Sequence, residues 1–157
     1  MSKLLKLSFV LLSTLVLFAS ENPWVGTWKL DPAKSKLTTY PKSIKESTVT
    51  IREVPPQAME VAIKGTAVDG TSVSRRWTTA VDGGPTTYLE GGPPAGVSEN
   101  TTVIGDKVRD TTMTRDGKTL ATMHIVLSED GKSMTTRTKG VTVDGQPLDT
   151  SGFYDKQ

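Results

Sequence analysis

Beyond residue 20, no stretch of this sequence carries apolar residues at helical spacing for more than one turn. Short alternating segments rich in Thr and Val recur instead, separated by sequences such as Asp69-Gly70, Asp116-Gly117 and Asp144-Gly145. Alternation with a period of two, interrupted by Asp-Gly pairs, is typical of antiparallel strands joined by tight turns. The pattern therefore predicts an all-β fold.

Ten segments have this character: residues 24–30, 47–54, 59–67, 72–80, 86–89, 100–105, 107–115, 118–127, 133–142 and 150–156. Strands joined by such short connections should pair as antiparallel hairpins. Closing the sheet removes its unpaired edges. We therefore expect an antiparallel up-and-down meander of about eight to ten strands closed into a lipocalin-like barrel, with a two-sheet sandwich as the alternative.

The longest connection after the first strand, residues 31–46, begins with Asp31-Pro32. Asp can cap a helix and Pro can occupy its first position. We expect at most one short helix here, placed to cover one end of the barrel. A plain crossover along the surface is the alternative.

The first 19 residues have the composition of an export signal. They contain Lys3 and Lys6, no acidic residue, and an apolar run over residues 7–18. This run is typical of a signal-peptide core and short for a membrane-spanning helix. We expect residues 1–19 to be a signal peptide, cleaved near Ala19, and residues 20–157 to form one periplasmic or secreted domain. An uncleaved anchor is the alternative.

The charge balance argues against polyanionic partners. The whole chain has 19 basic and 17 acidic residues, and removing the two lysines of the predicted signal peptide leaves a domain without net charge. A neutral domain without a Lys/Arg block has no electrostatic footprint for nucleic acid or an anionic membrane. We expect a monomer that binds no nucleic acid and makes no stable membrane insertion.

Several kinds of catalytic chemistry lack their usual residues. The chain has one His and no Cys, so a zinc site of the usual composition is unavailable. It also has no calcium loop, no Gly-x-Ser-x-Gly sequence, no phosphate loop and no dinucleotide-binding sequence. We therefore expect no metal and no cofactor.

The first predicted strand contains Gly26-Thr27-Trp28 within the longer run 24–36, and the chain ends Phe153-Tyr154-Asp155-Lys156. Behind a signal peptide, this combination resembles a family of uncharacterised exported bacterial proteins, lipocalin-like (calycin-type) small barrels. The resemblance implies a barrel in which Gly26 and Trp28 are structural, with Trp28 plugging the closed end. The sequence lacks the cysteine pair and final helix of typical lipocalins and the two-helix lid of fatty-acid-binding proteins, so the resemblance implies no particular ligand.

The hairpin over residues 59–80 places an arginine among apolar residues. A three-residue loop ending in a left-handed Gly70 would put Ile63 opposite Arg75 and Val61 opposite Trp77. We choose this register over that of a two-residue loop because it brings the apolar residues onto one face. It also points Arg75 inward, where it would bind an anionic ligand or form an internal ion pair.

The hairpin over residues 118–142 decides the position of the single His. A three-residue turn over residues 129–131 would pair Val126 with Met134 and His124 with Thr136. This register favours an inward His124, although the opposite face carries apolar residues too. A threonine-rich interior would suit an amphipathic or sugar-like ligand, while threonines on a solvated face would reflect only strand propensity.

The turn at Asp116-Gly117 leaves two arrangements open. A two-residue loop would put Arg109 opposite His124, whereas a three-residue loop would put Val108 there, with Asp110 one step away. The second arrangement would bring a carboxylate close to the imidazole, which any general acid–base mechanism would require.

We interpret the chain as an exported, non-enzymatic barrel that binds a small organic molecule, anionic or amphipathic in character. The candidate residues that would face this ligand are Arg75, His124, Thr136, Arg109 and Trp77. The first alternative is an envelope or extracellular interaction module whose barrel is filled by side chains. The second is a hydrolase or isomerase that uses His124.

Overall fold

The structure is a computed structural model that describes residues 22–40 and 43–157. The predicted signal peptide and its cleavage site near Ala19 lie outside the described residues. The described residues form one 3₁₀ turn, η1 (Pro32–Lys34), and the following strands: β1 (Gly26–Leu30), β2 (Ile44–Val54), β3 (Ala58–Ala67), β4 (Ser72–Ala80), β5 (Gly83–Pro85), β6 (Thr87–Glu90), β7 (Val97–Val103), β8 (Val108–Arg115), β9 (Lys118–Leu127), β10 (Ser133–Val141) and β11 (Pro147–Lys156).

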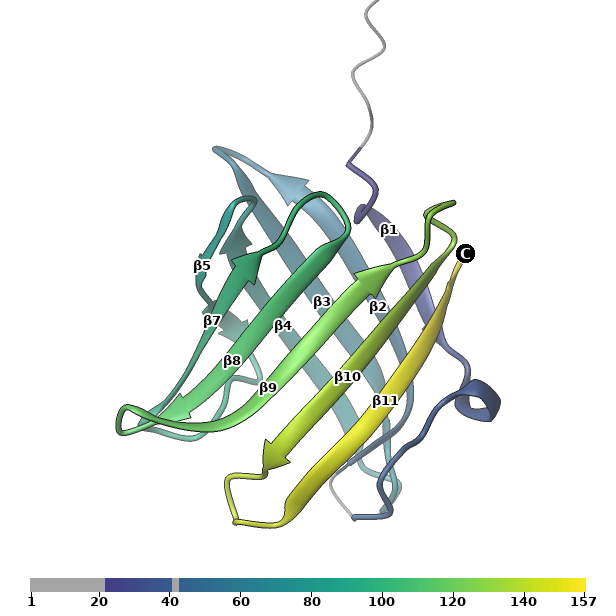
Figure 1. The fold of residues 1–157 in the computed structure, drawn as a ribbon. Helices are drawn as coiled ribbons and strands as arrows, with labels where there is room; N and C mark the ends of the chain where they lie inside the picture. The colour runs from purple at the N-terminus through teal and green to yellow at the C-terminus, as the bar shows by residue number, and fades with distance from the viewer. Residues whose placement is uncertain (1–21, 41–42) are drawn as a thin grey trace, which may run out of the picture.

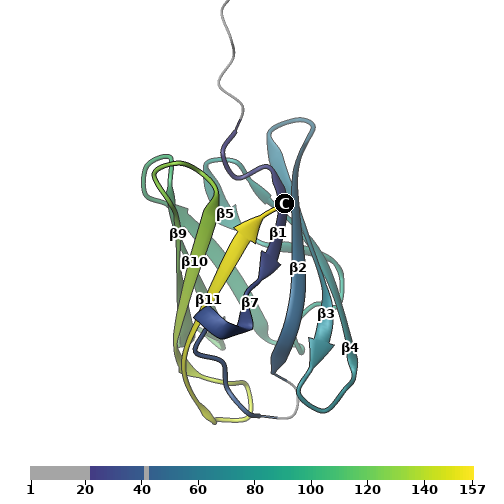
Figure 2. The same cartoon turned by 90° about the vertical axis from the view of Figure 1, so that its right-hand side faces the viewer.

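All of these strands belong to one antiparallel sheet in the order β5-β7-β8-β9-β10-β11-β1-β2-β3-β4-β6. The sheet curls into a barrel in which the last strand lies beside the first (Figures 1 and 2). The predicted meander and barrel are confirmed, and the two-sheet sandwich is not formed. Within the described residues, no helix has the length and apolar character needed to cross a membrane.

A bent segment joins the two edges of the sheet. β5 pairs with β7 and β6 pairs with β4, and only Thr86 separates β5 from β6. The backbone N–H of Thr86 donates a hydrogen bond to the carbonyl of Glu99 on β7. The chain therefore crosses from one edge to the other within a few residues and nearly closes the barrel. Gly83 and Gly84, which lie outside the ten predicted segments, form part of β5, and this adds a strand to the predicted number.

The predicted short helix is the single turn η1. Asp31 caps it, because its carboxylate accepts a hydrogen bond of 2.9 Å from the backbone N–H of Ala33. The turn does not cover a barrel end. It packs against β11, where the ammonium of Lys34 lies 4.6 Å from the centre of the Phe153 ring. The connection thus follows the alternative of a surface crossover (Figure 2).

The predicted register of β3 and β4 is confirmed. Gly70 has a φ of +83° and its N–H donates a hydrogen bond to the carbonyl of Ala67. The resulting pairs are Ile63 with Arg75 and Val61 with Trp77. The apolar side chains of the two strands therefore share the inward face.

The predicted register of β9 and β10 is wrong by one residue. The turn contains one more residue than expected, since the backbone N–H of Ser128 donates to the carbonyl of Ser133. Asp130 stabilises this longer turn by accepting hydrogen bonds from the Ser128 hydroxyl and the Lys132 N–H. Met134 consequently pairs with Leu127 rather than Val126. Because side chains alternate along a strand, a shift of one residue moves the whole set to the other face.

The register of β8 and β9 follows neither arrangement left open by the sequence. Asp116 and Gly117, with φ of 50° and 75°, form the two-residue turn. A bulge between Thr114 and Met113 then shifts the pairing by one residue, so Arg109 faces Ile125 and Asp110 faces His124. A bulge puts two residues of one strand opposite one residue of its neighbour.

The apolar core lies at the end of the barrel where β1 begins, which we call the closed end. Trp28 is fully buried there, and its indole N–H donates to the carbonyl of Trp24. The ammonium of Lys156 lies 5.0 Å from the centre of the Trp28 ring and donates to the carbonyl of Pro23. Gly26 has a φ of +144°, and a Cβ at this position would lie 2.6 Å from Cε of Lys156. Gly26 and Trp28 therefore both belong to the close packing of this end.

Candidate ligand-binding cavity

A cavity of about 80 Å³ lies inside the barrel, between Trp24 at the closed end and residues of β2, β3, β4, β7, β8, β9 and β10. It is smaller than the roughly 300–1,000 Å³ of pockets that hold drug-sized molecules. Three methionines line the cavity: Met59, Met123 and Met134. Methionine side chains rearrange at low cost, so these walls can adapt to the shape of a small molecule.

Arg109 is the most unusual residue of the cavity. It is only 5% exposed, and its guanidinium stacks on Trp24 with 4.9 Å between the guanidinium carbon and the ring centre. One nitrogen, Nη2, donates a hydrogen bond of 3.0 Å to the carbonyl of Val81. The other two nitrogens, Nε and Nη1, are buried and have no partner among the described residues.

The charge of Arg109 is also uncompensated. In the described part of the chain, no carboxylate oxygen lies within 4.0 Å of its guanidinium. Burial lowers the pKa of Arg109 below its ordinary value. A guanidinium remains charged in proteins nevertheless, so the cavity holds a desolvated cation with open hydrogen-bond donors.

Hydroxyl groups line the wall beside this cation. The Thr79 hydroxyl is buried and lacks a partner among the residues that the structure describes. The hydroxyls of Thr101 and Thr111, on the neighbouring strands β7 and β8, lie 3.0 Å apart and share a hydrogen bond. These threonines give one wall of the cavity a polar character, while Val61, Ile51 and other apolar side chains supply the remaining walls.

An aromatic pair and a carboxylate lie farther from the closed end. Trp77 lines the cavity, and its ring centre is 5.9 Å from that of Tyr88 at a tilt of 44°. Glu99 lines the same cavity and lies beside the Tyr88 hydroxyl. Burial, and secondarily the hydrogen bond and charge of Glu99, raise the pKa of Tyr88 above its ordinary value. Tyr88 therefore keeps its proton.

Arg75 occupies the inward-facing position that we predicted, but its side chain is exposed. It has no ion-pair partner in residues 22–40 and 43–157, so the internal ion pair considered above does not form. Its charge acts on Tyr88, whose pKa it lowers slightly against the larger effect of burial. Arg75 thus lies near the cavity without lining it.

His124 points away from the barrel interior, and its predicted inward orientation is wrong. The neighbouring Met123 and Ile125 line the cavity, so alternation directs His124 outward, where its side chain is 52% exposed. Its Nδ1 lies 2.5 Å from a carboxylate oxygen of Asp110. The carboxylate of Asp110 can orient the imidazole of His124, but neither residue lines the cavity.

Thr136 points inward, as predicted, but toward Gly152 and Tyr154 rather than into the cavity. Its predicted pairing with His124 is replaced by pairing with Ile125. No group of three or more potential metal-binding side chains occurs in the part of the chain that the structure describes.

Sequence reasoning missed the polar residues of β7 and β4. We began the predicted strand at residue 100, which excluded Glu99, although the alternation of Glu99, Thr101 and Val103 could have placed all three on one face. Thr79 gave no signal of its own, because threonine is common on both faces of strands.

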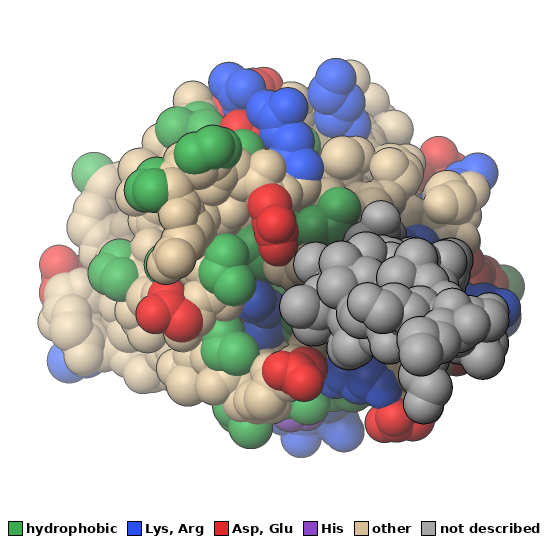
Figure 3. Space-filling view, turned by 90° about the horizontal axis from the view of Figure 1, so that it is seen from above, with side chains coloured by type: hydrophobic (Ala, Val, Ile, Leu, Met, Phe, Trp, Pro, Cys, Tyr) green, Lys and Arg blue, Asp and Glu red, His purple; other side chains and the backbone are tan. Residues whose placement is uncertain are grey.

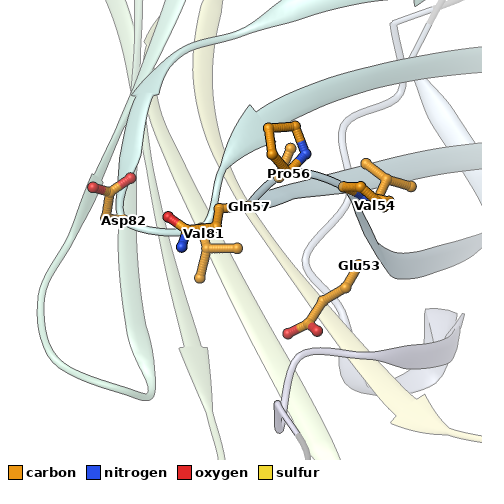
Figure 4. Close-up of a pocket in the computed structure, with 8 residues that line it drawn as sticks. Glu53, Val54, Pro56, Gln57, Val81 and Asp82 are labelled. Atoms are coloured by element: carbon orange, nitrogen blue, oxygen red, sulfur yellow. The ribbon is translucent and has the colours of Figure 1, made fainter.

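A second concavity lies at the end of the barrel, beside the hairpin that joins β2 to β3. This groove of about 700 Å³ is lined by Glu53, Pro56, Gln57, Val81 and Asp82, among others (Figure 4). Val81 packs against the core, and its carbonyl is held by Arg109, so it separates the groove from the internal cavity. Figure 3 shows the molecule from above, where hydrophobic side chains gather among scattered acidic ones.

Comparison with solved structures identifies proteins of similar fold. The crystal structure of the wild-type fluorescent protein UnaG matches 85% of this chain and 97% of its own, with a TM-score of 0.55 at 14% identity. This similarity shows that the chain shares the β-barrel fold of that protein. No model of a known protein family and no curated protein sequence matches the chain.

Two designed proteins match with lower scores. A fluorescence-activating β-barrel of de novo design matches 85% of this chain and 94% of its own at 18% identity, with a TM-score of 0.44. The redesigned barrel mFAP1, in a structure bound to DFHBI, matches 86% of this chain and 95% of its own at 12% identity, with a TM-score of 0.40.

Proposed function

We propose that this protein is an exported, non-enzymatic barrel that binds a small anionic organic molecule in its interior. The observation that carries the proposal is the buried guanidinium of Arg109, whose Nε and Nη1 have no partner among the described residues. A carboxylate is the ligand group that guanidinium binds with the strongest hydrogen bonds. Arg109 would hold this group, and the Thr79 hydroxyl, which lines the same cavity without a partner among the described residues, would donate a further hydrogen bond.

The physical cost of Arg109 supports this role. Leaving a buried donor unsatisfied costs about 1–3 kcal/mol, and more for a charged group. Replacing even a buried ion pair by apolar side chains of similar volume is often neutral or stabilising, and a buried charge without a partner costs more than a paired one. A barrel filled only for stability would therefore gain from an apolar residue at position 109. A bound anion would offset the cost of the cation.

The alternative of a structural module with a filled barrel is favoured by one observation, the narrowness of the cavity, about 80 Å³. The hydrolase or isomerase alternative requires a substrate site beside His124. That residue lies on the outer face with Asp110, away from the cavity. The structure therefore gives the binding function more support than catalysis.

Calorimetric titration of the purified protein with acetate, butyrate and benzoate tests the proposal. We expect saturable binding of at least one of these carboxylates, and its loss in Arg109→Met, which preserves the apolar stem of the side chain. Arg76→Met is the matched control, because Arg76 is exposed on the same sheet. Unchanged binding in Arg109→Met, or no binding to the native protein, would contradict the proposed function.

Export is a separate part of the proposal and rests on residues 1–19. Their two lysines and apolar run are typical of a signal peptide, and a cut near Ala19 would leave the barrel domain intact. Amino-terminal sequencing of the protein recovered from the periplasm or the medium should give a first residue within two positions of Ala19. An intact Met1 on protein fixed in a membrane would show that the segment is an anchor.

A further inference from the structure

Two opposite charges line the same cavity without pairing. Arg109 lies at the closed end and Glu99 lines the cavity from β7. The pairing of β7 with β8 places Arg109 opposite Val103 and Glu99 opposite Met113. At about 3.3 Å per residue, the four residues from Glu99 to Val103 span about 13 Å along the strand. The two charges consequently lie at different levels of the barrel.

The wall between the two charges is formed by hydroxyl groups. Thr101 and Thr111 pair with each other at the level between Glu99 and Val103, and both line the cavity. These hydroxyls are neutral, so this wall compensates neither charge. The cavity is therefore polar along one side, with a cation at one level and a carboxylate at another.

The surroundings of Glu99 favour a cation. Trp77, on β4, lines the same cavity, and Tyr88 packs against Trp77 with 5.9 Å between ring centres. Aromatic faces attract ammonium groups, and a carboxylate beside them adds a charged hydrogen-bond acceptor. Arg75, whose charge acts on Tyr88, is exposed and forms no ion pair with Glu99 within 4.0 Å in the described residues.

We infer that the ligand of this cavity is a small zwitterion, whose carboxylate binds Arg109 and whose ammonium group lies between Glu99 and the Trp77 ring. This inference rests on the proposed function, because it takes the carboxylate to be bound by Arg109 and adds a binding site for a second group of the same ligand. A simple carboxylate would compensate Arg109 and leave Glu99, which is half-buried and bonds to the neutral Tyr88 hydroxyl, without a counter-charge. A zwitterion compensates both charges, and its small size fits the volume of about 80 Å³.

Calorimetric titration with a chain-length series tests the inference. The probes are β-alanine, 4-aminobutyrate, 5-aminopentanoate and 6-aminohexanoate, each compared with the carboxylate and the amine of the same chain length. We expect one amino acid of the series to bind at least tenfold more tightly than both of its single-charge analogues. The preferred length reports the distance between the two charged subsites.

Two variants assign the subsites. Glu99→Gln should remove the tenfold preference for the amino acid while leaving the affinity for the simple carboxylate unchanged or higher. Glu90→Gln is the matched control, because Glu90 is an exposed carboxylate on the neighbouring β6. Arg109→Met should abolish binding of both probes. Circular dichroism of each variant verifies that the barrel is intact.

The outcomes separate the inference from the proposed function. If carboxylates bind through Arg109 and the amino acids show no advantage, the zwitterion inference is wrong and the proposed function stands. A preference that persists in Glu99→Gln also overturns it, because the ammonium group would then lie elsewhere. If no probe binds, or if binding does not depend on Arg109, both are wrong.

Discussion

The guanidinium of Arg109 stacks on the indole of Trp24, 4.9 Å from the ring centre, while its Nη2 bonds to the carbonyl of Val81. Trp24 is itself fixed, because its indole N–H donates a hydrogen bond of 2.8 Å to the carbonyl of Asp106. These contacts hold one face and one nitrogen of the guanidinium. The remaining nitrogens stay free to bind a ligand, and the orientation of the side chain is set before the ligand arrives.

Arg109→Met should stabilise the ligand-free protein. Methionine retains the apolar stem and removes a desolvated charge. We expect this gain to exceed the loss of the contact with Trp24 and of the hydrogen bond to the Val81 carbonyl, and to raise the free energy of unfolding by about 1 kcal/mol or more. Urea unfolding followed by tryptophan fluorescence measures the change. Arg76→Met, at an exposed position, should change it by less than about 0.5 kcal/mol. A clear loss of stability in Arg109→Met would show that the charge is needed for folding rather than for binding.

Trp28→Ala should destabilise the barrel strongly. Trp28 is the largest fully buried side chain, and its loss would open a cavity at the closed end. We expect a decrease of about 3–5 kcal/mol in the free energy of unfolding. Leu89→Ala, at a side chain that is 49% exposed, is the control and should cost far less. A loss below about 1 kcal/mol for Trp28→Ala would contradict the role of Trp28 in the core.

Gly26→Ala should cost more than Gly70→Ala. Both glycines have positive φ, but a Cβ at Gly26 would also meet Cε of Lys156 at 2.6 Å, whereas Gly70 has open space. The strained backbone at Gly26 should cost about 1–3 kcal/mol. Displacement of the Lys156 ammonium from Pro23 and Trp28 would add to this. Thermal unfolding of both variants, and of Gly26→Ala combined with Lys156→Ala, measures the coupling, and equal losses for the two glycines would contradict the prediction.

His124→Ala should leave ligand binding unchanged, because His124 and Asp110 lie on the outer face. Their pair is partly exposed, so its loss should cost less than about 1 kcal/mol of stability. Titration with the carboxylate that binds the native protein measures the affinity, and urea unfolding measures the stability. A tenfold loss of affinity would place His124 at the site and contradict the register of β9.

Arg75→Met should change stability by less than about 0.5 kcal/mol, since its side chain is exposed and has no ion pair in the described residues. Its affinity for the carboxylate that binds the native protein should be nearly unchanged. Urea unfolding measures the stability, and calorimetric titration measures the affinity. A stability loss of about 3–5 kcal/mol would instead reveal a buried partner for Arg75.

The candidate site could be predicted only in part from the sequence. Alternation correctly joined Trp77 and Arg75 to the inward face of β4, because a single loop, closed by Gly70, fixes that register. The position of Arg109 stayed open, since two turn lengths gave opposite faces. In the structure, the two-residue turn at Asp116-Gly117 is followed by a bulge, and together they direct Arg109 inward. No feature of the local sequence predicts this bulge.

The sequence by itself determined the all-β class, the meander, the capped turn after Asp31 and the position of Trp28 in the first strand. Each of these depends on residues close together in the chain, where spacing and turn chemistry fix the local geometry. Tertiary structure alone decided which faces of β8 and β9 turn inward. A shift of one residue in a turn or a bulge reverses every side chain of a strand, and the packing of the closed barrel selects between the two results. That selection put His124 outside and Arg109 inside.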